Sequence, residues 1–291
     1  EGASAARAVP WLATPLPARS GGGSRYVGSD MAPPSSLVWL KLVAIILHGA
    51  TQAAHRLSSG ISVFVHCSDG WDRTAALTSL AQLLVDPHYR TLPGLCTLVE
   101  KDWCTFGHRF GRRSGTGGNG IDRSNHKDDQ RAPIFAQWVD AVWQVWRQFP
   151  HAFQFNERML VLLMEAAYSG RFGTFLYDCE RDRVEAHVPD TTVSLWSYVL
   201  HPDHVPTYLN PMYRSGHGEW EVAADELVAA SEADESAAPA APATDAVAAI
   251  AAAAPARIKF RLGAHTLTPD VRVETLQVWP YWRAKWSVLL G

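Results

Sequence analysis

A cysteine and an arginine stand six positions apart in the stretch VFVHCSDGWDRTAALTSLAQLL, residues 63–84. The stretch predicts a strand that leads into Cys67, a tight loop that curls at Gly70, and a helix that opens at Thr74. Backbone N–H groups in such a loop, together with the helix N-terminus, favour an anion. They can lower the pKa of a cysteine to about 3.5–7.5. The sequence therefore predicts a reactive thiolate at Cys67.

The same loop suits a phosphate group. N–H donors that stabilise a thiolate also fit phosphate oxygens, and the planar guanidinium of Arg73 can bind two of those oxygens at once, unlike a lysine. This arrangement favours attack on phosphorus through a cysteinyl-phosphate intermediate. A bare C-x5-R pattern also arises by chance, as a buried cysteine before a helix with the arginine on the surface.

Helical periodicity dominates the rest of the chain. It predicts helices at 36–57, 74–85, 97–113, 134–148 and 156–169, and one buried strand at 61–66. Asn156 is the expected N-cap of the last of these helices and Gly170 its terminator. One strand among many helices predicts the fold class α/β with a helix-rich periphery.

Composition divides the chain into four parts. Residues 1–35 are predicted to be an irregular leader, 36–215 the body that holds the cysteine loop, 216–256 a linker rich in Ala and acidic residues, and 257–291 a terminal segment. The net charge is −3, and 221–256 holds seven acidic residues and no Lys or Arg, which leaves +4 on the remainder. A mildly basic body fits an anionic substrate and does not suggest nucleic acid.

No motif in the sequence predicts a metal or an organic cofactor. The four cysteines lack CxxC spacing, which favours a reducing, cytoplasmic setting. The glycines of 115–120 satisfy G-x-G-x-x-G, but they have no preceding strand and no following helix. His201 and His204 lack a third candidate ligand nearby.

The segment HCSDGWDRTA, residues 66–75, resembles the active-site signature of the myotubularin family of phosphoinositide 3-phosphatases. The resemblance continues without a gap through 77–113, and the segments PIFAQWVDAVWQVWRQFPHAFQFNE, GRFGTFLYDCE, TVSLWSYVL and YLNPMY extend it to residue 213. A weaker patch covers 271–286. The resemblance implies a sheet like that of the cysteine phosphatases, incomplete within this chain and surrounded by many helices, in a phosphatase domain at 36–215 with 257–291 as its terminal segment. It also implies activity on phosphatidylinositol 3-phosphate, with the 3,5-bisphosphate as a further candidate, at the cytoplasmic surface of phosphoinositide-containing membranes.

The resemblance also implies roles for individual residues. Cys67 would be the nucleophile, Arg73 the phosphate-binding side chain, and Asp72 the general acid or the group that positions water. The implied substrate-binding residues are Ser68, Asp69, Gly70, Trp71, Thr74, Arg109 and Arg113. Within this set Thr74 could hydrogen-bond the sulfur, and the two arginines, four residues apart on one expected helix face, would hold a second phosphate.

The chain also departs from the family pattern. Residues 1–35 do not resemble the family's lipid-binding N-terminal domain or the first half of its catalytic domain, so the strand at 61–66 is expected to lack partners and turnover to be weak. Two alternatives stay open, a protein tyrosine or dual-specificity phosphatase and a truncated, non-catalytic interaction module. The sequence leaves the oligomeric state undetermined.

Overall fold

The computed structural model describes residues 36–116, 130–214 and 266–282. The predicted leader, the acidic linker and most of the segment after 257 lie outside these ranges. The chain separates into the units Glu1–Pro33 and Pro34–Gly291, and every described residue belongs to the second.

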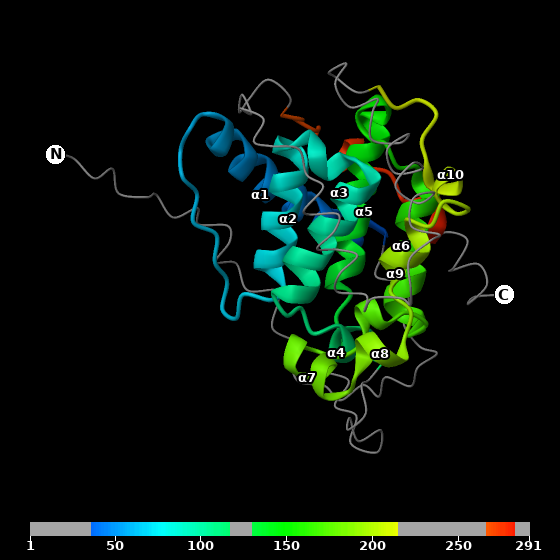
Figure 1. The fold of residues 1–291 in the computed structure, drawn as a ribbon. Helices are drawn as coiled ribbons and strands as arrows, with labels where there is room; N and C mark the ends of the chain where they lie inside the picture. The colour runs from blue at the N-terminus through cyan, green and yellow to red at the C-terminus, as the bar shows by residue number, and fades with distance from the viewer. Residues whose placement is uncertain (1–35, 117–129, 215–265, 283–291) are drawn as a thin grey trace. The chain divides into compact units, whose positions relative to one another are not determined.

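The described residues form α-helices joined by short turns (Figure 1). The long helices are α1 (Ser36–Ser58), α2 (Arg73–Val85), α3 (Leu92–Val99), α5 (Ile134–Gln148) and α6 (Glu157–Ser169). Shorter ones are α4 (Phe110–Ser114), α7 (Glu180–Glu185), α8 (Val188–Thr191), α9 (Leu195–Val199) and α10 (Val205–Tyr208). A π-helical turn, η3 (Glu100–Thr105), and the single-turn 3-10 helices η2 (Pro87–Arg90), η6 (Pro150–Ala152), η7 (Gly173–Phe175) and η8 (Val273–Thr275) complete the set. The predicted helices at 36–57, 74–85, 134–148 and 156–169 are confirmed to within a residue or two.

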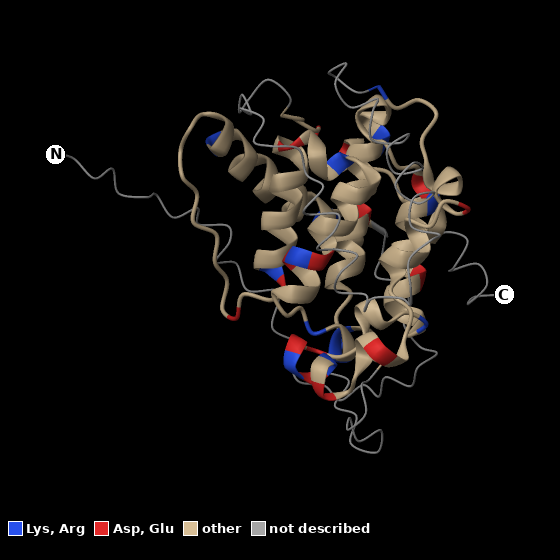
Figure 2. Cartoon of the chain, viewed as in Figure 1, with Lys and Arg blue, Asp and Glu red and all other residues tan. Residues whose placement is uncertain are grey.

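Helices α1, α2 and α5 pack against one another and form the centre of the core (Figure 1). Leu40, Val43 and Leu47 lie on the buried face of α1, as its periodicity predicts, whereas Leu37 at its first turn is exposed. By length and composition α1 could cross a membrane, but half of the residues concerned are buried inside the fold. Basic and acidic residues both occur in the ribbon at the end of the fold where α4, α7 and α8 lie (Figure 2).

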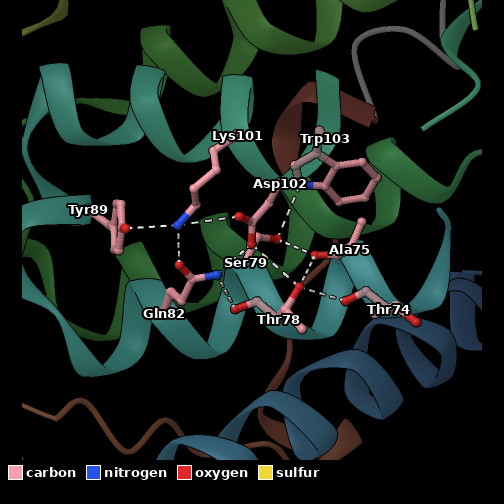
Figure 3. Close-up of polar contacts among 9 residues, drawn as sticks. All are labelled: Thr74, Ala75, Thr78, Ser79, Gln82, Tyr89, Lys101, Asp102 and Trp103. Atoms are coloured by element: carbon pink, nitrogen blue, oxygen red, sulfur yellow. Dashed lines mark hydrogen bonds and ion pairs between the residues drawn. The ribbon is translucent and has the colours of Figure 1, made fainter. Parts of the chain in front are cut away.

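The structure interrupts the helix predicted at 97–113. Helix α3 passes at Glu100 into η3, which ends at Thr105, and Gly107 then turns the chain with a φ of +81° before α4 begins at Phe110. The widened turn directs two successive side chains toward α2 (Figure 3). Asp102 accepts a hydrogen bond from Gln82, and Trp103 Nε1 donates to Ser79 Oγ over 3.1 Å. Both side chains belong to the π turn, so η3 is an element that anchors α2.

The predicted strand at 61–66 is not confirmed by the structure. The described residues contain one isolated bridge, Phe155 to Leu209, and no sheet. Phe64 is 87% exposed and Ile61 50% exposed, so the described part of the chain does not bury this segment as predicted. The physical reason is that a strand is buried by its neighbours, and the described residues supply none.

The segment 266–282 docks on the helices through its tryptophans. Trp279 is fully buried, stacks on Trp143 of α5 with ring centroids 5.8 Å apart, and donates a 2.6 Å hydrogen bond to Glu157 of α6. Trp282 of the same segment and Trp39 of α1 both donate to Asp140 Oδ2 on α5. The segment is thus attached to α1, α5 and α6 by buried aromatic side chains and their hydrogen bonds.

We predict that Trp279→Ala lowers the free energy of unfolding by about 3–5 kcal/mol, because it leaves a cavity beside Trp143. Trp279→Phe keeps most of the volume and loses the bond to Glu157, so its effect is smaller. Urea unfolding of the full chain, followed by circular dichroism, measures both. Val184→Ala, at an exposed position, is the control. An unchanged unfolding midpoint for Trp279→Ala would contradict docking of this segment.

Candidate active site

Cys67 lies at the start of a loop that runs into α2. The backbone N–H of Gly70 donates to Cys67 Sγ over 3.2 Å, and Gly70 adopts a φ of +91°, which favours glycine. Partial burial acts to raise the pKa of the Cys67 thiol. The Thr74 side chain and the N–H groups of Gly70, Thr74 and Asp69 outweigh it, so the pKa is lowered. The thiolate predicted from the sequence therefore has a structural basis.

Arg73 spans this loop from its far end. It is the first residue of α2, its side chain is exposed, and Nη2 donates to Ser68 Oγ over 2.8 Å. Ser68 follows the nucleophile directly, so the guanidinium reaches back to the start of the loop. A planar fork at this place can meet two oxygens of a phosphate that the loop holds.

Asp72 is held on both of its oxygens. Arg113 donates to Oδ2 over 2.8 Å and to Oδ1 over 3.2 Å, and His108 Nδ1 lies 3.1 Å from Oδ1. Partial burial raises the pKa of Asp72, but His108 and Arg113 outweigh it and bring the pKa to about 2. The carboxylate is therefore ionised at neutral pH in this state. Sequence reasoning missed His108, because a histidine within an expected helix gives no sign that it faces the loop.

The two arginines predicted to share a helix face contact different parts of the loop. Arg109 precedes α4 in a non-helical conformation, and its guanidinium lies 4.0 Å from the centre of the Trp71 ring, a cation–π contact. Arg113 lies within α4 and binds Asp72 and the Gln130 carbonyl oxygen. The two arginines lie one helical turn apart, because the Arg113 N–H donates to the Arg109 carbonyl over 2.8 Å, and both lie against the loop.

The loop and α4 therefore bring the predicted site residues together. Ser68, Gly70, Trp71, Asp72, Arg73, Thr74, Arg109 and Arg113 have contacts that place them around the Cys67 loop. Asp69 takes part through its backbone N–H alone, and its side chain is exposed. This arrangement combines a stabilised thiolate, N–H donors and a guanidinium, which together suit nucleophilic attack on a phosphate.

Comparison with known proteins identifies the family. A family described as "Myotubularin-like phosphatase domain" matches residues 33–184, just over half of the chain. The chain belongs to the myotubularin-like phosphatases. The resemblance found in the sequence is thereby confirmed.

Relatives agree with this assignment. Myotubularin of Xenopus laevis is 49% identical over 176 residues, which are 60% of this chain and 28% of that protein. A phosphatidylinositol-3,5-bisphosphate 3-phosphatase of Caenorhabditis elegans is 45% identical over 180 residues, 61% of this chain and 29% of that enzyme. One from Bos taurus is 50% identical over 174 residues, 60% of this chain and 26% of that enzyme. The chain thus spans less than a third of the length of these relatives.

The other cysteines of this myotubularin-like chain differ from Cys67. Cys96 and Cys104 are buried, and burial raises the pKa of each thiol. Within the described ranges no group of three or more His, Cys, Asp or Glu side chains gathers as a metal set. The contrast makes selective chemistry at Cys67 a direct test of the loop.

We predict that iodoacetamide alkylates Cys67 with a pH midpoint below the ordinary cysteine pKa of about 8.5. Thr74→Val should raise that midpoint, because it removes the side-chain hydroxyl that stabilises the thiolate. Mass spectrometry of timed samples measures the rate at each cysteine, and Cys96 and Cys104 should stay unlabelled in the folded chain. Thr97→Val, whose hydroxyl donates to Pro93, is the matched control. A midpoint that Thr74→Val leaves unchanged argues against the hydroxyl.

Proposed function

We propose that this chain removes the 3-phosphate of phosphatidylinositol 3-phosphate through a cysteinyl-phosphate intermediate, with the 3,5-bisphosphate as a second substrate. The observation that carries the proposal is the loop itself, in which N–H donors lower the pKa of Cys67 and Arg73 reaches back to Ser68. The names of the relatives from Caenorhabditis elegans and Bos taurus supply the substrate class. Such a substrate is reached from the cytoplasmic face of a membrane, with the chain bound peripherally.

In the first step, Cys67 Sγ attacks phosphorus while the bond from phosphorus to the inositol oxygen breaks. Arg73 and the loop N–H groups stabilise the charge that the phosphoryl oxygens carry in the transition state. Asp72 donates a proton to the leaving oxygen. A dianionic phosphate in the loop raises the pKa of a neighbouring carboxyl, so a proton can reside on Asp72 once substrate is bound.

In the second step, water attacks the phosphorus of the intermediate, the sulfur–phosphorus bond breaks, and the thiolate leaves. The proton of the water passes to Asp72, which restores the acid form for the next turnover. The ionised state that His108 and Arg113 impose on Asp72 suits this acceptor role. One carboxyl group thus serves both steps.

The proposal extends to the fold that supports the loop. We infer that residues 61–66 are a strand of a phosphatase sheet whose partner strands lie outside the described residues. The segment ISVFVH is apolar on both faces, as expected for a strand covered on each side. Phe64 is 87% exposed, which supports the inference that further residues pack over its side of the segment.

Turnover of short-chain phosphatidylinositol 3-phosphate, compared with a phosphotyrosine peptide, tests the proposed function. We expect phosphate release from the lipid only, and its loss in Cys67→Ser with binding retained, because a serine hydroxyl is not ionised at neutral pH. Preference for the peptide would favour a tyrosine phosphatase. Binding without turnover in the unaltered chain would favour an interaction module.

The two arginines should behave differently. Arg109→Ala should lower kcat/KM on the 3,5-bisphosphate more than on the monophosphate. The Arg109 guanidinium has no carboxylate partner among the described residues, so it can bind a second phosphate. Loss of such a contact costs about 1.5–3 kcal/mol. Arg113→Ala should impair both substrates alike, because Arg113 holds Asp72. Arg112→Ala, which removes a pair with Asp178, is the control. Equal losses from Arg109→Ala on both lipids would remove its role in selectivity.

A further inference from the structure

His108 is held in place by contacts that are separate from those it makes with the loop. Its side chain is 2% exposed, although the residues that it contacts belong to a loop open to solvent. The imidazole packs edge-on between the rings of Trp103 and Phe110, with both centroid distances 4.8 Å. Its backbone N–H donates to the Trp103 carbonyl over 2.9 Å, which closes the turn after η3. The ring therefore has little freedom to rotate or shift.

One nitrogen of this ring contacts two successive loop residues. Nδ1 lies 2.8 Å from the Trp71 carbonyl oxygen and 3.1 Å from Asp72 Oδ1. Both partners are acceptors, so Nδ1 carries a hydrogen and donates to both. A histidine that only filled the core would need neither contact. Here the backbone of one residue and the side chain of the next are fixed by the same donor, immediately before Arg73.

The other nitrogen shows which form of the ring suits this place. Nε2 is buried and has no hydrogen-bond partner among the described residues. A second N–H there would be buried without an acceptor, which is costly. The neutral form with hydrogen on Nδ1 therefore fits the site. The guanidinium of Arg113 places a full positive charge beside Asp72, and His108 supplies direction.

His108 and Arg113 thus hold Asp72 from different elements. Arg113 belongs to α4. His108 belongs to the turn after η3, which is closed by the hydrogen bond from the His108 N–H to the Trp103 carbonyl. The same Trp103 donates to Ser79 in α2, as Figure 3 shows. The donor and the helix that follows the loop are therefore attached to one rigid side chain. A fixed distance between them keeps Asp72 in a constant place relative to the loop.

We propose that His108 is a positioning residue that orients the Asp72 carboxylate for proton transfer by holding it together with the Trp71 carbonyl. The proposal rests on the proposed phosphatase function, in which Asp72 exchanges a proton with the leaving inositol oxygen and with water. His108 itself need not touch the substrate.

The test compares His108→Phe, which keeps the ring volume and removes the donor, with His108→Asn, whose Nδ2 can replace Nδ1. His108→Phe should lower kcat on short-chain phosphatidylinositol 3-phosphate by about 10- to 100-fold with little change in KM. An aryl phosphate, whose leaving group needs no proton, should be affected less, and His108→Asn should restore most of the rate. His204→Phe is the matched control, because His204 Nδ1 also contacts a carbonyl, that of Tyr198, at 2.8 Å, away from the loop.

A double variant separates positioning from general destabilisation. The double variant with His108→Phe and Asp72→Asn should have the same kcat as Asp72→Asn alone, since both substitutions act through the transfer of one proton. Additive losses, or equal losses on the lipid and the aryl phosphate, would overturn the proposal while leaving the phosphatase function intact. Thermal melts of each variant check that the fold is retained.

A second measurement needs no turnover. Titration of the Asp72 carboxyl carbon by NMR in the full chain should show a higher pKa in His108→Phe than in the unaltered protein, and a value near the original in His108→Asn. An unchanged Asp72 pKa in His108→Phe would defeat the positioning role even if no substrate were turned over. Absence of turnover in the unaltered chain, with this shift present, would defeat only the proposed function.

Discussion

Helix α2 begins at Arg73, directly after the loop, so any movement of the helix moves one end of the Cys67 loop with it. The helix is fixed by burial against α1 and α5, and along its other side by the buried polar contacts of η3. Asp102, only 1% exposed, is part of this attachment, and burial raises its pKa even though Lys101, Gln82 and Thr78 act to lower it. A buried polar group that is well bonded specifies one register of packing, because sliding α2 would leave it unpaired. The π turn is therefore the feature on which the geometry of the loop depends.

The two acidic groups of the site, the Cys67 thiol and the Asp72 carboxyl, are stabilised in their ionised forms by different partners. The thiolate of Cys67 is stabilised by N–H dipoles and Thr74, whereas the carboxylate of Asp72 is stabilised by Arg113 and His108. This separation leaves Arg73 without a carboxylate partner among the described residues, bound only to the neutral Ser68 hydroxyl. A guanidinium that is bonded to a neutral hydroxyl loses less free energy when it turns to a phosphate oxygen than a guanidinium that is bonded to a carboxylate. The site is thus open to an anion at Arg73 and closed to one at Arg113.

Sequence patterns predicted the elements better than their connections. The long helices α1, α2, α5 and α6 follow from apolar periodicity, and the thiolate loop follows from the residues between Cys67 and Arg73. The break at Phe106–Arg109 could not be predicted, because Glu100–Phe110 has helical composition and a π turn arises from tertiary contacts with α2. For the same reason the sequence gave no role to His108. For the segment at 61–66, the sequence predicted a strand but could not predict whether it is buried, since burial of a strand depends on neighbouring strands that its own residues do not specify.

The two ends of the loop consequently differ in support. Asp72 and Arg73 belong to the end that the buried helices hold, and their contacts run to α4 and to the turn after η3. Cys67 belongs to the other end, where Gly70 and Thr74 hold the sulfur but residues 61–66 have no strand partner among the described residues. Pairing of that segment would remove conformational freedom from Cys67 while leaving Asp72 where it is. In the proposed mechanism, the acid–base half of the site is thus built by the helices described here, and the accuracy with which Cys67 meets phosphorus depends on the backbone that leads into it.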